Sequence, residues 1–134
     1  MHRYLPGYIW FCVAVISVCL LAPSVQAHAR LIKSLPAQKG EIPGPNLKLE
    51  LWFNELLEEN FNSVEVFAAG DIGSKPRVNL AKRKPVLDKV DTTHLTLELT
   101  GLKPGEYIVE YRVLSRDGHS APGRLSFVVT AGGK

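Results

Sequence analysis

The sequence predicts an all-β sandwich of about seven strands. In several short segments apolar residues recur at every second position, which is the period of a half-buried strand. Glycine and proline interrupt the chain between these segments, as they do between the strands of all-β domains. No segment of useful length repeats its apolar residues at the helical period, so we do not expect helices to build the core.

The clearest strand in the sequence is the segment 47–53, in which leucine or phenylalanine occupies every second position. Before it, residues 28–36 predict a strand that Pro36 ends. Residues 40–45 predict a rigid connection, because they contain two glycines and two prolines. After the clear strand, residues 54–60 are expected to form a helical turn or a bulged connection.

The middle of the chain predicts two further strands separated by a loop. Residues 61–67 form the first of them, with their two central valines on one face. Residues 68–91 are rich in glycine, proline and basic residues, so we expect a loop with at most short edge strands and a solvated basic face that guards a sheet edge. The segment 93–99 alternates again, which places its three leucines inward and leaves His94 at the surface.

The last part of the chain predicts a long strand, a loop and a final strand. A turn at residues 102–106 leads into the strand 107–113, in which every second residue is tyrosine or valine. A tyrosine just after such a corner is the one that ties a crossing loop in Greek-key sandwiches, so Tyr107 is expected to donate a phenolic hydrogen bond. After the loop 115–119, alternating apolar residues over 125–129 predict the final strand.

Residues 1–27 have the features of a secretory signal peptide. Arg3 lies near the start, an apolar run extends from Tyr8 to Ala22, and a small-x-small cleavage site ends at Ala27. Because the run is short for a bilayer span, a retained signal anchor is the less favoured alternative. Cleavage would leave residues 28–134 as a single domain exported to the periplasm, although a cut after Ala29 also satisfies the small-x-small rule.

Composition narrows the classes of function. The net charge is +3 with histidine neutral, a surplus too mild to indicate a nucleic acid partner. Cys12 and Cys19 both lie inside the predicted signal peptide. The exported domain would therefore have no disulfide, and no cysteine that could carry a lipid anchor for a membrane.

The candidate metal site combines two distant parts of the sequence. Asp117 and His119 are two residues apart, so on an extended backbone their side chains leave the same face, although Asp-Gly is also ordinary turn chemistry. Cleavage after Ala27 would make His28 the first residue, and its α-amine and ring nitrogen would then chelate one ion. Because the amine must lose its proton, affinity should rise with pH. Such nitrogen and oxygen donors suit Cu(II), and zinc could use the same atoms.

Four segments of the sequence, taken together, point to a known family. In chain order they are His28-Ala29 with Ser34-Leu35-Pro36-Ala37, then Leu51-Trp52-Phe53-Asn54-Glu55, then Pro104-Gly105-Glu106-Tyr107, and last Ser115-Arg116-Asp117-Gly118-His119 followed by Gly123 and Phe127. With these segments the chain resembles the CopC family of periplasmic copper-binding proteins over essentially all of residues 28–134. Each segment alone is modest, but their order and spacing are specific.

The resemblance implies an immunoglobulin-like Greek-key β-sandwich or barrel, cupredoxin-like in outline, that holds one Cu(II) through His28, Asp117 and His119. It also implies that Glu55 lies near the metal as a weak axial or hydrogen-bonding carboxylate, and that an inner-membrane copper transporter of the CopD type is a candidate partner. Some members of the family carry a methionine-rich Cu(I) segment. Residues 68–80 contain neither methionine nor histidine here, so we expect a protein for Cu(II) alone.

The leading hypothesis is therefore a copper buffer or carrier and not an enzyme. If Asp117 fills the fourth in-plane position, no place is left for substrate or oxygen. One alternative is an oxygen-activating copper oxidase or monooxygenase, since lytic polysaccharide monooxygenases also use an N-terminal histidine chelate. The small size of the chain and a single remaining tryptophan, Trp52, argue against it. The other alternative is an immunoglobulin-like interaction module that binds no metal.

Overall fold

A computed structural model describes residues 28–132, so the predicted signal peptide lies outside the described residues. The described chain contains eight strands and one short 3-10 helix. In chain order the elements are β1 (Leu31–Leu35), β2 (Gly40–Pro43), β3 (Leu47–Phe53), β4 (Ser63–Ala68), η1 (Ala69–Asp71), β5 (Val86–Leu87), β6 (His94–Leu99), β7 (Gly105–Leu114) and β8 (Ser120–Thr130). Between residues 28 and 132 there is no helix long and apolar enough to cross a membrane.

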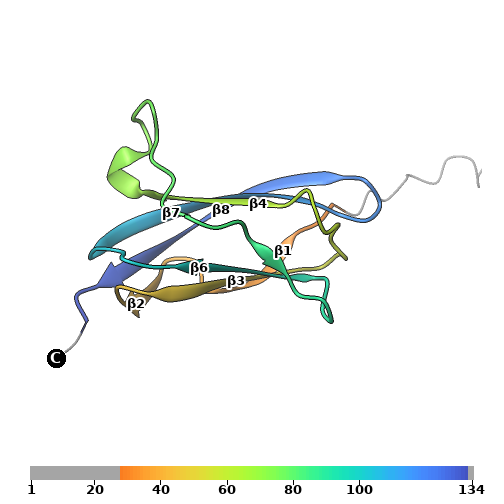
Figure 1. Cartoon of the computed structure of the whole chain (residues 1–134), viewed down its shortest axis with the longest axis horizontal. Helices are drawn as coiled ribbons and strands as arrows, with labels where there is room; N and C mark the ends of the chain where they lie inside the picture. Colours follow the sequence, from red (N-terminus) through yellow and green to blue (C-terminus); the bar gives the residue numbers. More distant parts are fainter. Residues whose placement is uncertain (1–27, 133–134) are drawn as a thin grey trace, which may run out of the picture.

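The strands form two four-stranded sheets that pack face to face (Figure 1). The first sheet has the strand order β1-β3-β6-β5 and the second has the order β2-β8-β7-β4. This architecture confirms the predicted all-β sandwich. The described residues form eight strands where about seven were predicted. The two shortest, β2 and β5, are edge strands of four and two residues.

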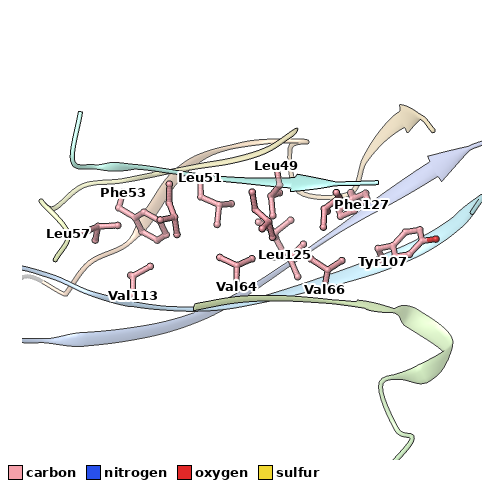
Figure 2. Close-up of a cluster of buried hydrophobic side chains, with 14 of the residues drawn as sticks. Leu49, Leu51, Phe53, Leu57, Val64, Val66, Tyr107, Val113, Leu125 and Phe127 are labelled. Atoms are coloured by element: carbon pink, nitrogen blue, oxygen red, sulfur yellow. The ribbon is translucent and has the colours of Figure 1, made fainter. Parts of the chain in front are cut away.

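The core lies between the sheets and is built from every second residue of the long strands (Figure 2). Leu49, Leu51 and Phe53 of β3 are almost completely buried, as the period of two predicted. Across the sandwich, the core receives Val66 of β4 and Phe127 of β8, which are also fully buried. Burial of one face of each strand explains why the sequence pattern was so regular in these segments.

The predicted tyrosine corner is present. The Tyr107 hydroxyl donates a hydrogen bond of 2.7 Å to the carbonyl oxygen of Lys103, in the turn before β7. The ring itself is buried and stacks on Phe127, with the two ring centroids 5.5 Å apart. One side chain therefore joins the crossing turn to the core.

Residues 40–45 were predicted to form a rigid connection, and this prediction is wrong. Residues 40–43 form β2, which pairs in parallel with β8 and places Gly40 opposite Phe127. Because β2 lies at a sheet edge, Pro43 can end it although its backbone has no N–H to donate. The pairing partner lies far along the chain, so local sequence carried no signal for this strand.

The predicted surface position of His94 is also wrong. Its side chain is only 13% exposed, because it stacks on Trp52 of the neighbouring strand with ring centroids 4.3 Å apart. Lys33 lies over the same tryptophan, with Nζ 4.6 Å from the ring centroid. The alternation along β6 was read correctly, but neighbours from β1 and β3 cover the outward side of the sheet at this point.

Candidate metal centre

The predicted site residues lie at one end of the sandwich. Three segments meet there: the start of the described chain, the connection that follows β3, and the turn between β7 and β8 (Figure 1). The C-terminal end of the described chain lies at the opposite end (Figure 1). Segments that are far apart in sequence are therefore brought to one place by the antiparallel course of the strands.

The N-terminal arm, residues 28–30, is held by burial and by hydrogen bonds. Ala29 is 6% exposed and belongs to the hydrophobic core. Next to it, the Arg30 backbone N–H donates to Asn54 Oδ1 at 2.6 Å. The Asn54 backbone N–H donates in return to the Arg30 carbonyl oxygen at 3.1 Å. The backbone two residues after His28 is therefore joined to the end of β3.

The connecting segment, residues 54–58, continues from Asn54 to the β7–β8 turn. Leu57 is 1% exposed and forms an isolated β-bridge with Ser115. The Arg116 N–H donates to the Leu56 carbonyl oxygen at 2.9 Å, and the Glu58 N–H donates to the Leu114 carbonyl oxygen at 2.8 Å. The same short segment therefore contacts the N-terminal arm on one side and the β7–β8 turn, residues 115–119, on the other.

The β7–β8 turn, residues 115–119, presents Asp117 and His119. Backbone hydrogen bonds close it, from the Ser115 N–H to the His119 carbonyl oxygen at 3.0 Å and from the Gly118 N–H to the Ser115 carbonyl oxygen at 2.9 Å. Gly118 has a φ of +90°, which favours glycine because a side chain would strain the backbone. A buried serine, a glycine and two hydrogen bonds thus shape this turn.

The Asp117 carboxylate is strongly stabilised in its charged form. The Ser115 hydroxyl donates a hydrogen bond to Asp117 Oδ1, and the His119 backbone N–H donates to the same oxygen at 3.1 Å. These bonds, with a smaller contribution from the His119 side chain, lower the pKa of Asp117 from 3.8 to about 2. Asp117 therefore carries its negative charge at every physiological pH.

Two imidazoles and this carboxylate lie close together. The ring centroids of His28 and His119 are 5.7 Å apart, and the rings are inclined by 20°. His119 Nδ1 lies 3.1 Å from Asp117 Oδ1, yet this nitrogen is buried and makes no hydrogen bond. The nitrogen and the oxygen therefore lie side by side, as two donors to a single ion must.

The structure brings the predicted ligands together as pairs. Across residues 28–132, no group of three or more histidine, cysteine, aspartate or glutamate side chains is close enough to hold an ion. Glu55 lies in the connecting segment and is half-buried. Its neighbours Asn54 and Leu56 contact the arm and the turn, so Glu55 lies between the two parts of the site.

Two residues that shape this end of the molecule were not assigned a role from the sequence. Asn54 joins the arm to β3, and Ser115 supports the Asp117 carboxylate. Asparagine just after a strand and serine two residues before an aspartate often make local side-chain hydrogen bonds, which is the signal that could have found them. A role across distant segments, as for Asn54, needs the tertiary structure.

The model of one protein family, the CopC domain, matches residues 31–130. Asp117 and His119 lie inside the matched range, and His28 lies three residues before it. The match therefore covers all eight strands that the structure describes and both candidate ligands of the β7–β8 turn.

Individual proteins are similar over most of the chain. Protein YobA of Escherichia coli is 31% identical over 120 residues, which are 89% of this chain and 92% of YobA. The copper transport protein CutJ of Bacillus subtilis is 29% identical over 90% of this chain but only 21% of its own length. The crystal structure of PcoC, a methionine-rich copper resistance protein from Escherichia coli, has a TM-score of 0.65 at 27% identity, covering 78% of this chain and 100% of PcoC. The chain therefore belongs to the CopC family.

Proposed function

We propose that this protein holds one Cu(II) ion in the periplasm, as a copper buffer or carrier. The ligands are the α-amine and ring of His28, the Asp117 carboxylate and the His119 ring. The observation that carries this proposal is the approach of His28 to His119, whose ring centroids are 5.7 Å apart, beside a carboxylate 3.1 Å from His119 Nδ1. Similarity to a copper transport protein and a copper resistance protein supports copper as the ion.

Each proposed ligand has a definite chemical part. The two histidines supply nitrogen donors, which Cu(II) binds more strongly than most divalent ions do. Asp117 supplies an oxygen and a negative charge that offsets the charge of the ion, and it needs no deprotonation above pH 4 because its pKa is about 2. Processing after Ala27 supplies the α-amine, so export and metal binding are coupled. Glu55 adds a weak axial or hydrogen-bonding carboxylate.

The donor set favours the oxidised ion. The sequence holds one methionine, Met1, and both of its cysteines lie before residue 28. The exported domain would therefore have none of the soft sulfur donors that Cu(I) prefers. PcoC, in contrast, is described as methionine-rich. Reduction should loosen the ion, which gives the carrier a way to release it.

The proposed role is transport or storage and not catalysis. The two nitrogens of His28, the His119 ring and Asp117 would fill the four in-plane positions of a tetragonal site, which leaves no strong in-plane position for a substrate. The similarity to one fifth of CutJ supports a partner, because in CutJ a sequence like this chain is part of a longer copper transport protein. We therefore propose an inner-membrane copper transporter of the CopD type as the partner that exchanges the ion.

The test is copper binding by the exported protein. Intact mass should show a chain that begins at His28 and gains one copper, and a Cu(II) titration should give a single visible d–d band. His119→Ala and Asp117→Ala should weaken binding while circular dichroism stays unchanged, because both residues lie in an exposed turn. His94→Ala is the matched control, since this histidine packs on Trp52 outside the site.

Several outcomes would overturn the proposal. A product that begins at Arg30, or a wild-type protein that takes up no copper, would remove the site. Unchanged copper affinity after ascorbate reduction would exclude release by reduction. Hydrogen peroxide formation or polysaccharide oxidation by the copper-loaded protein would instead indicate an enzyme.

A further inference from the structure

We infer that Asn54 is a positioning residue that sets the copper affinity without contacting the ion. It does so by holding the N-terminal arm, residues 28–30, against the end of β3. This inference rests on the proposed function, because it concerns the strength of the same copper site. The residues that carry it are Asn54, Arg30 and the connecting segment 54–58.

Asn54 closes a reciprocal pair of hydrogen bonds with the arm. Its Oδ1 accepts the Arg30 N–H at 2.6 Å, and its own backbone N–H donates to the Arg30 carbonyl oxygen at 3.1 Å. The arm precedes β1, which begins at Leu31, and the pairing of β1 with β3 is irregular between Leu31 and Lys33. The regular strand ladder therefore does not reach His28, and the contacts of Asn54 take its place.

The other side of the connecting segment is joined to the β7–β8 turn. The Arg116 N–H donates to the Leu56 carbonyl oxygen at 2.9 Å, and Leu57 pairs with Ser115 while its side chain is buried in the core. The five residues of the connecting segment, 54–58, thus link the arm that carries His28 to the turn that carries Asp117 and His119. Through this segment, Asn54 fixes the position of the arm relative to the turn.

This arrangement matters because a chelate at a chain terminus is costly to order. Fixing the backbone of an otherwise mobile arm opposes binding, since each residue loses conformational entropy. If only the closed arm binds copper, the observed affinity falls in proportion to the fraction of molecules in which the arm is closed. Asn54 raises that fraction before copper arrives, which is preorganisation of the site.

The direct test is Asn54→Ala in the exported protein, with Cu(II) affinity measured by competition with a chelator. We expect affinity to fall about two- to tenfold, the range that loss of one ordinary hydrogen bond produces. Asn46→Ala is a matched control: its Oδ1 accepts the Gly101 N–H at 3.1 Å, but Asn46 precedes β3 and lies at the opposite end of the strand. Asn46→Ala should leave copper affinity unchanged.

A double-mutant cycle separates positioning from general loss of structure. In a His28→Ala background the arm keeps its α-amine but loses the imidazole, so adding Asn54→Ala should lower the copper affinity by a smaller factor than it does in the wild-type background. Asn54→Asp keeps the acceptor oxygen, so its affinity should not fall below that of wild type. In the metal-free protein, hydrogen exchange at the Arg30 amide should be faster in Asn54→Ala than in wild type, and it should be unchanged in Asn46→Ala.

The possible results are distinct. Wild-type protein that binds no copper would refute the proposed function. Normal wild-type binding with an equal loss in Asn54→Ala and Asn46→Ala, or with the full Asn54→Ala effect retained in the His28→Ala background, would refute only the positioning role. The same holds if Asn54→Asp loses as much affinity as Asn54→Ala.

Discussion

Replacing Ser115 with alanine should raise the pKa of Asp117. The Ser115 hydroxyl bond to the carboxylate is the largest of the interactions that hold this pKa at about 2 instead of 3.8. Alanine cannot donate, so the charged carboxylate loses that stabilisation. The His119 backbone N–H, 3.1 Å from Oδ1, remains. We therefore expect the pKa of Asp117 in Ser115→Ala to lie between about 2 and 3.8.

The same change has a defined effect on acid stability. A carboxyl group whose pKa is depressed in the folded protein contributes stability above its unfolded pKa and loses it as the pH falls through its folded pKa. For Asp117 this window extends from about pH 4 down to about pH 2. In Ser115→Ala the folded-state pKa of Asp117 rises toward the unfolded value, so the pH range over which the carboxylate loses stability becomes smaller. The unfolding free energy should therefore change less between about pH 4 and about pH 2.

The assay is a carbon-detected NMR titration of the Asp117 carboxyl in metal-free protein. Ser126→Ala is the control, because Ser126 is the other buried serine of residues 28–132 and lies in β8 away from the turn. An Asp117 pKa that stays near 2 in Ser115→Ala would refute the assignment of the hydroxyl bond as the main cause. An equal rise in Ser126→Ala would attribute the change to general loosening of the fold.

Two further predictions concern the sandwich. Tyr107→Phe should lower the unfolding free energy by about 0.5 to 1.5 kcal/mol, because the hydrogen bond to the Lys103 carbonyl oxygen is lost. Urea denaturation measures this change. Tyr111→Phe is the control and should change the unfolding free energy less, because the Tyr111 hydroxyl makes no hydrogen bond to the described residues. Gly123→Ala should lower the unfolding free energy by about 1 to 3 kcal/mol in the same assay, because an added Cβ would lie 2.1 Å from the Tyr111 ring. That ring packs edge-on against Phe53. Wild-type stability in this variant would show that the ring moves freely.

The strands that could be predicted are those with one buried face. In β3 and β6 every second residue is buried, so the period of two is visible without knowledge of the partner strand. The parallel edge strand β2 could not be predicted, because its four residues depend on pairing with β8. The packed position of His94 escaped prediction for the same reason: its cover comes from Trp52, on another strand.

For the site, local spacing alone placed Asp117 and His119 together, because two residues on a tight turn cannot separate far. The sequence also determined the charge, the scarcity of sulfur ligands after residue 27, and the candidate cleavage site that would make His28 a terminus. Only the tertiary structure decided that His28 lies 5.7 Å from His119, ring to ring, and that Asn54 holds the arm there. These are contacts between segments far apart in the chain, which depend on how the two sheets pack and not on any local pattern.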